Sequence, residues 1–141
     1  MRFMILVKAN KYTEAGGMPS EQLLAEMRQY NEELVKAGVL LSAERLLPTS
    51  KGTRIKFSGG KRTVSNGPFT ESKGLVAGLW MFQVKSMDEA IEWVKCCPIP
   101  VDEEAEIEIR QVSEAADFGA EFTYEFRNTE ERMHKQVFAK K

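Results

Sequence analysis

The chain has 141 residues, 43% of them hydrophobic and 29% charged, which is typical of one soluble globular domain with a real core. The formal net charge of -1 gives no general attraction to nucleic acid or anionic membranes, and no apolar run approaches the ~20 residues that span a bilayer. The first apolar run, residues 3–7, is too short for a signal peptide, and the two adjacent cysteines form no disulfide framework. We therefore expect a cytoplasmic protein.

The first third of the chain predicts a strand, a helix and a second strand. Residues 3–7 are apolar at every position, so this strand needs cover on both faces. Residues 8–17 are polar and end in two glycines, which favours a loop. Ser20 is a typical N-cap for a helix whose apolar residues recur at helical spacing, and Gly38 is its expected stop. A strand over 39–47 follows.

The sequence from residue 53 to residue 112 predicts four strands and one further helix. These strands cover residues 53–57, 61–65, 75–84 and 106–112. The first two are the arms of a hairpin with polar residues alternating outward. Ser86 and Glu89 have the spacing of a capping box and open the helix, which Pro98 ends.

This order of elements is the split β-α-β pattern of a ferredoxin-like α+β fold, with an antiparallel sheet and both helices on one face. The other face would be apolar. Its expected residues are Met4 and Leu6, with either Trp80 and Phe82 or Leu79 and Met81. A soluble monomer rarely exposes such a patch, so the pattern predicts a homodimer that buries it.

The motif after the hairpin resembles that of a known family. Residues 66–68 read Asn-Gly-Pro, which is turn chemistry because Gly67 tolerates a positive φ. Residues 66–73 are similar to the Asp-Gly-Pro-Phe-Ala-Glu-Thr-Lys-Glu signature of YCII-related, DGPF-type proteins. The similarity covers roughly residues 1–112, and it implies a dimeric α+β barrel in which two ferredoxin-like sheets pack face to face.

The charged segment 113–141 is expected to be a partly helical extension, with a helix over 129–139.

The resemblance does not supply a reaction. Some YCII-related proteins are thought to use a His-Asp pair, but Asn66 stands at the signature aspartate and the only histidine, His134, lies in the tail. A lone histidine predicts neither a metal site nor haem, and we expect no cofactor. Cys97 ends a helix, where the dipole disfavours a thiolate, so packing is expected of it rather than nucleophilic work.

Glu71 and Lys73 are the first candidates for a polar site, since residues two apart on an extended chain project to one side. Lys73 would bind a small anionic ligand, and Glu71 would orient it or move a proton. The alternative is that both tie the turn to neighbouring strands or to the dimer mate. Asn66 cannot be a general base and is expected to cap the turn. Further pocket candidates are Glu44, Arg45, Tyr12 and Trp80. The alternatives are an interface or salt-bridge role for Glu44 and Arg45 and a core role for Trp80.

The sequence thus favours a small ligand-binding or accessory homodimer, with no nucleic-acid or membrane partner. The basic residues of the hairpin lack interleaved stacking aromatics, and they are better explained as a solvated edge guarded against strand addition. One alternative is a cofactor-independent enzyme of the dimeric α+β barrel type, acting on a small anionic or carbonyl substrate. The other is a regulatory protein partner, which the resemblance suggests because many DGPF-type proteins are associated with extracytoplasmic-function sigma factors.

Overall fold

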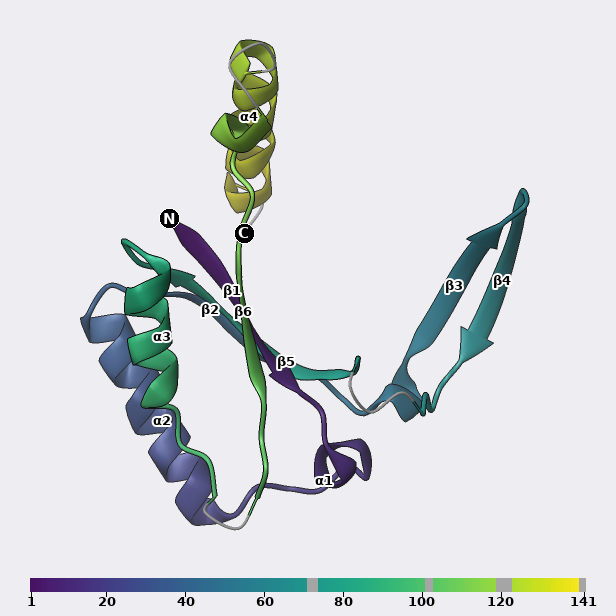
Figure 1. The fold of residues 1–141 in the computed structure, drawn as a ribbon, viewed down its shortest axis with the longest axis vertical. Helices are drawn as coiled ribbons and strands as arrows, with labels where there is room; N and C mark the ends of the chain where they lie inside the picture. Colours follow the sequence, from purple (N-terminus) through teal and green to yellow (C-terminus); the bar gives the residue numbers. More distant parts are fainter. Residues whose placement is uncertain (71–73, 101–102, 119–122, 140–141) are drawn as a thin grey trace. The chain divides into compact units, whose positions relative to one another are not determined.

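The computed structural model describes residues 1–70, 74–100, 103–118 and 123–139. The strands in Figure 1 are β1 (Arg2–Lys8), β2 (Leu40–Arg45), β3 (Thr53–Ser58), β4 (Lys61–Asn66), β5 (Val76–Gln83) and β6 (Ile107–Gln111). The helices are α1 (Lys11–Glu14), α2 (Glu21–Lys36), α3 (Met87–Lys95) and α4 (Thr123–Ala139), with 3-10 turns η1 (Thr49–Lys51) and η2 (Ala115–Phe118). They form two compact units, Met1–Gln111 and Val112–Lys141.

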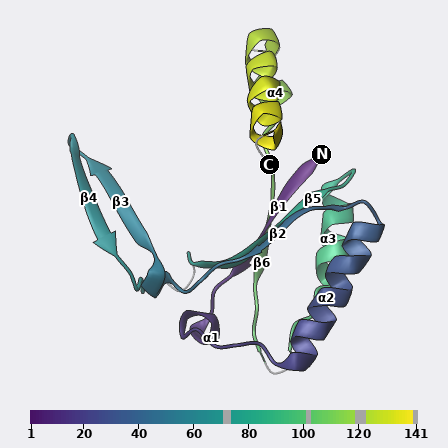
Figure 2. The ribbon, with the colours of Figure 1, turned by 180° about the vertical axis from the view of Figure 1, so that it is seen from behind.

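The first unit is built on a four-stranded sheet in the order β2-β5-β1-β6. Every neighbouring pair in this sheet is antiparallel. Helices α2 and α3 lie together on one side of the sheet, as Figures 1 and 2 show. This arrangement confirms the predicted ferredoxin-like α+β fold.

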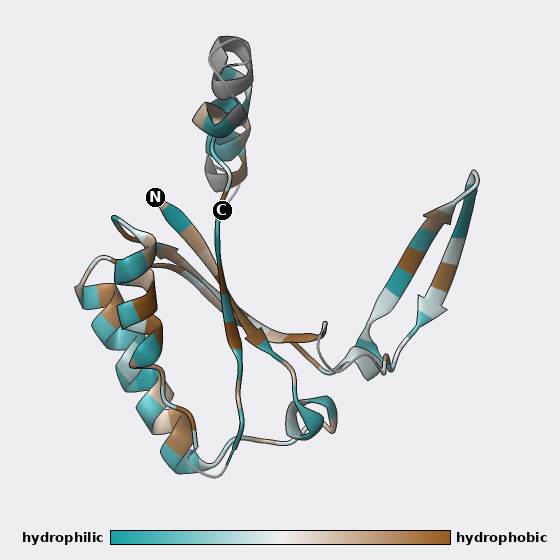
Figure 3. Cartoon of the chain, in the orientation of Figure 1, coloured by the Kyte–Doolittle hydropathy of each residue, from teal (hydrophilic) through white to brown (hydrophobic). Residues whose placement is uncertain are grey.

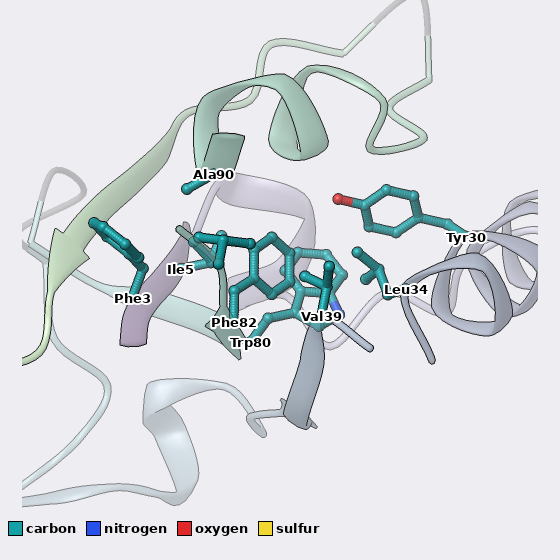
Figure 4. Close-up of a cluster of buried hydrophobic side chains, with 9 residues drawn as sticks. Phe3, Ile5, Tyr30, Leu34, Val39, Trp80, Phe82 and Ala90 are labelled. Carbon is teal, nitrogen blue, oxygen red and sulfur yellow. The ribbon is translucent and has the colours of Figure 1, made fainter. Parts of the chain in front are cut away.

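The core lies between the sheet and these two helices (Figure 4). The register of β1 and β5 pairs Phe3 with Phe82 and Ile5 with Trp80, so these four side chains share one face. Phe3, Ile5, Phe82 and Leu34 of α2 are fully buried. Burying side chains of this size stabilises the fold by about 1.5–3 kcal/mol each.

The same register decides which residues lie on the opposite face of the sheet. Met4 pairs with Met81 and Leu6 with Leu79, and all four side chains keep intermediate exposure. Trp80 therefore belongs to the core. We call the surface formed by Met4, Leu6, Leu79 and Met81 the open face; its burial in a homodimer stays a prediction.

The predicted helix starts carry the expected capping bonds. Ser20 Oγ accepts a hydrogen bond from the amide of Leu23 at 3.1 Å, and Ser86 Oγ accepts one from the amide of Glu89 at 3.1 Å. The Glu89 carboxylate reaches back to the amide of Lys85, at 2.9 Å. Side-chain oxygens thus satisfy amides that the first turns leave without helical partners.

Two expectations about helices were wrong. The segment 8–17, expected to be a loop, contains α1, whose N-cap Asn10 exchanges hydrogen bonds with Thr13. One helical turn is too short for hydrophobic periodicity to reveal. Helix α4 begins at Thr123 rather than at residue 129, because residues 123–128 contain no glycine or proline to interrupt a helix. No helix within the described residues has the length and apolar character needed to cross a membrane.

The β3–β4 hairpin was predicted, but it forms a sheet of its own. Its turn contains Gly59 and Gly60, which have φ values of 56° and 78° and so use the left-handed region that favours glycine. Every residue of both strands is exposed. Figure 1 shows the hairpin extending from the end of the four-stranded sheet where β2 ends and β5 begins.

Candidate functional site

A cavity of about 350 Å³ lies in the first unit, among the ends of β1, β2 and β5, helix α2 and the connection from α3 to β6. Most of the lining is apolar. Its larger apolar side chains include Leu23, Leu24, Met27, Trp80, Cys97 and Ile99. Its polar lining residues include Lys8, Asn31, Glu44, Arg45 and Glu103.

Trp80 is held in one orientation inside this cavity. Its indole Nε1 donates a hydrogen bond to Asn31 Oδ1 at 3.0 Å, and its ring meets Tyr30 edge-on with centroids 5.8 Å apart. The Tyr30 hydroxyl donates in turn to the carbonyl of Trp93 at 2.7 Å, which links α2 to α3. Burial raises the pKa of Tyr30 well above its ordinary value, so the hydroxyl stays protonated. These contacts fix the orientation of the Trp80 ring in the lining of the cavity.

Asn31 was not recognised from the sequence. It lies four residues after Met27 and three before Leu34, on the stripe of α2 that turns toward the sheet. A polar residue on such a stripe needs a partner, and this spacing was the available signal. The partner, Trp80, is 49 residues away in the sequence and could not be named in advance.

Two cationic side chains that line the cavity, Lys8 and Arg45, have different partners. Lys8 Nζ pairs with Glu108 Oε1 at 3.3 Å. Arg45 Nη2 donates to the carbonyl oxygen of Gly17 at 3.2 Å, and within the described part of the chain no carboxylate lies at ion-pair distance from it. A guanidinium carries five N–H donors, so Arg45 can bind an anion through the remaining ones.

Cys97 lines the cavity as a neutral thiol. Burial raises its pKa from 9.0 to about 11, so almost none of it is thiolate at neutral pH. It packs against the core, in agreement with the role expected from its position after α3. Among the residues that the structure describes, no three His, Cys, Asp or Glu side chains are grouped so that they could hold a metal ion.

The structure distributes the predicted site residues among different places. Trp80, Glu44 and Arg45 line the cavity, whereas Tyr12 is not among the described lining residues and its hydroxyl donates to the carbonyl of Met18 at 2.7 Å. Asn66 lies at the exposed end of β4, where its Oδ1 accepts a hydrogen bond from the Thr53 hydroxyl at 3.1 Å. Glu71 and Lys73 lie outside the described residues, and their proposed role stays a prediction.

The Gly-Pro-Phe motif is tied to the base of the hairpin. The Gly67 amide donates to the carbonyl of Gly52 at 2.9 Å, and the Phe69 amide donates to Thr49 Oγ1 at 3.0 Å. The Thr49 amide donates to a carboxylate oxygen of Glu14 at 3.1 Å. Gly67 does not have the positive φ that turn chemistry suggested. It is needed because a Cβ there would lie 1.7 Å from the Thr49 carbonyl oxygen.

The fold and this cavity define a small α+β protein with a ferredoxin-like sheet and a hollow between sheet and helices. The chain belongs to the YCII-related family, because the family model of the YCII-related domain matches residues 1–116. It is also 29% identical over 75 residues, 53% of the chain, to an uncharacterized protein of Rhizobium meliloti (strain 1021). The match covers 60% of that relative, whose name specifies no activity.

Proposed function

We propose that this protein binds a small molecule with an apolar body and one acidic group in the cavity beside Trp80. The observation that carries the proposal is the largely apolar cavity, about 350 Å³ in volume, with the guanidinium of Arg45 in its lining. That volume is within the range of ligand pockets, roughly 300–1,000 Å³. Such pockets combine an apolar lining with a few polar groups that fix the orientation of the ligand.

The chemistry of the lining indicates the class of ligand. An apolar body would contact the ring of Trp80 and the side chains from α2. A carboxylate would bind Arg45 in place of the neutral Gly17 carbonyl, because charge-assisted hydrogen bonds are the stronger ones. Glu103 also belongs to the lining, and its carboxylate would repel a ligand carrying several negative charges, whereas Glu44 pairs with Leu79 and so projects toward the open face. A monocarboxylate therefore fits better than a phosphate ester.

A binding role is favoured over catalysis by the groups around the cavity. The thiol of Cys97 is protonated, and a buried neutral thiol is a poor nucleophile. Among the described residues, the lining includes no imidazole that could move a proton near neutral pH. The enzyme hypothesis depends on Glu71 and Lys73 as its polar pair. In the binding hypothesis the same two residues would contact the ligand.

Assembly through the open face is part of the proposal. Met4, Leu6, Leu79 and Met81 form a contiguous apolar surface, and a second copy would bury it through a two-fold contact. Sedimentation equilibrium tests this: the wild type should be a dimer and Leu6→Asp a monomer. Val35→Asp is the matched control, because Val35 is 63% exposed on α2, and it should leave the dimer intact. A wild-type monomer at micromolar concentration would contradict the proposal.

The free thiols of Cys96 and Cys97 suit a reducing cytoplasm, the location we propose.

Ligand binding can be tested with a panel of aliphatic and aromatic monocarboxylates and their methyl esters. The chain has two tryptophans, so a Trp93→Phe background leaves Trp80 as the only indole, and its fluorescence reports binding. Carboxylates should bind and raise the melting temperature, whereas the uncharged esters should not. Arg45→Gln should weaken binding by roughly tenfold or more, since hydrogen bonds to charged groups contribute about 1.5–3 kcal/mol.

The matched control is Arg62→Gln, which removes the same charge from the exposed hairpin. Its affinity for the carboxylates should equal that of the parent. If no carboxylate changes Trp80 fluorescence or the melting temperature, the binding proposal is wrong. If carboxylates bind equally well to Arg45→Gln, the assignment of the acidic group to Arg45 is wrong.

A further inference from the structure

The β3–β4 hairpin has one apolar and one basic face. Its register pairs Ile55 with Val64 and Phe57 with Arg62, and residues two apart on a strand project to the same side. Ile55, Phe57 and Val64 therefore share a face, with exposed fractions of 54%, 69% and 62%. Figure 3 shows the alternation of hydrophobic and hydrophilic residues along β3. Arg62 shares the face of Ile55, Phe57 and Val64, with its guanidinium carbon 5.4 Å from the Phe57 ring centroid. The opposite face carries Arg54, Lys56 and Lys61.

Such a hairpin is poorly suited to stand alone in water. A two-stranded sheet is at best marginally stable by itself, and it usually needs further strands or a packed face. None of the residues of β3 or β4 is buried in the described chain. Three large apolar side chains on one exposed face indicate a surface that a partner covers.

The charge distribution favours a second copy of the chain as that partner. Residues 51–66 contain five of the 20 basic residues and none of the 21 acidic residues. The rest of the chain therefore carries 15 basic residues against all 21 acidic ones. A hairpin with a charge of about +5 would meet a surface of opposite net charge on another copy, which favours association and its rate.

The dimensions of the hairpin also fit this partner. Six residues per strand, at about 3.4 Å each, give an arm roughly 20 Å long. A four-stranded sheet is roughly 14 Å wide between its outer strands, because strands lie about 4.8 Å apart. The hairpin leaves the sheet at its end, so a copy bound to the open face would be within its reach.

We propose that the β3–β4 hairpin is an arm that packs Ile55, Phe57 and Val64 against the second copy of this chain in the homodimer. The inference rests on the proposed homodimer and adds a contact outside the open face. Phe57 is the anchor of the arm because it is the largest and most exposed of the three side chains. The basic face of the hairpin steers the arm toward the acidic surface of the partner.

Sedimentation equilibrium of Phe57→Ser tests the energetic contribution of the arm. The dissociation constant of the dimer should rise roughly tenfold to a hundredfold for each arm that loses a buried phenylalanine. Lys56→Ser is the matched control, because Lys56 is the neighbouring residue on the opposite face, and it should change the constant less than Phe57→Ser does. A photo-cross-linking amino acid at position 57 should yield a covalent dimer on irradiation, and one at position 63 should yield much less.

The outcomes separate the arm from the homodimer itself. A wild-type chain that sediments as a monomer contradicts the homodimer and, with it, the arm. A wild-type dimer that Phe57→Ser leaves unchanged, with no cross-link from position 57, contradicts the arm alone. A cross-link from position 57 to nucleic acid or to another protein, but not to a second copy, also contradicts the proposal. Carboxylate binding, measured separately, is affected by none of these results.

Discussion

Replacing Gly67 by alanine should destabilise the protein, although the reduced freedom of the unfolded chain would by itself stabilise it slightly. A Cβ at this position would lie 1.7 Å from the Thr49 carbonyl oxygen, whereas real Cβ atoms essentially never come within 3.0 Å of a neighbour. The two backbone segments would have to separate by 1.3 Å, the difference between these distances. Because the obstacle is backbone, no side-chain rotation can relieve it.

The separation has a cost that follows from the contacts around Gly67. Two hydrogen bonds hold the segments together: Gly67 to Gly52, and Phe69 to Thr49. At about 1 kcal/mol net for each bond, their loss lowers the free energy of unfolding by about 2 kcal/mol. For a chain of this size that corresponds to a fall in melting temperature of roughly 6–8 °C.

Urea unfolding, compared at equal m-value, measures this loss. Gly74→Ala is the matched control, because a Cβ at Gly74 meets none of the described residues within 4 Å. That variant should stay within about 0.5 kcal/mol of the parent. A Gly67→Ala protein that loses less than about 1 kcal/mol would refute the close approach to Thr49 as the reason for this glycine.

Four further predictions concern single side chains. Tyr30→Phe removes a buried hydrogen bond of 2.7 Å and should lower the free energy of unfolding by about 1–2 kcal/mol, whereas Tyr12→Phe, at an exposed hydroxyl, should have a smaller effect in the same urea titration. Iodoacetamide at pH 8 should modify Cys96 before Cys97, as mass spectrometry can show, because burial raises the pKa of Cys97 to about 11. The contribution of the neutral Cys97 thiol to stability is complete below pH 9.0 and is lost as the pH rises toward about 11. The free energy of unfolding should therefore fall between these pH values, and it should fall less in Cys97→Ala than in the wild type. His134→Ala should leave the melting temperature and carboxylate affinity unchanged, because His134 is exposed on α4. A loss of either would contradict the expectation that the lone histidine holds no metal and does no chemistry.

Local patterns in the sequence determined the secondary elements and the fold. Ser20 and Ser86 mark helix starts because their side-chain oxygens bond amides only three residues away. The unbroken apolar run of residues 3–7 predicts two apolar faces because successive strand side chains point to opposite sides. Such interactions span a few residues, so the sequence alone exposes them. Even so, a single turn such as α1 carries too few residues to be recognised.

Tertiary structure decided the composition of the open face and of the cavity. The sequence left two sets of β5 residues open, and the choice came from the pairing of Ile5 with Trp80, because register depends on which strands become neighbours. Trp80, Glu44 and Arg45 were singled out from the sequence, yet Asn31 became apparent only when its partner was known, and the partner of Arg45 came from the structure. Those partners lie 49 and 28 residues away.

The requirement for glycine in the motif is the clearest case of this kind. The sequence marked Gly67 as a turn residue, but its φ is not positive, and the Thr49 backbone 18 residues away is what excludes a side chain. A local pattern encodes the conformations that the backbone can adopt. The space left for a Cβ, a ring or a bound ligand depends on segments that folding brings together, and no local pattern records those segments.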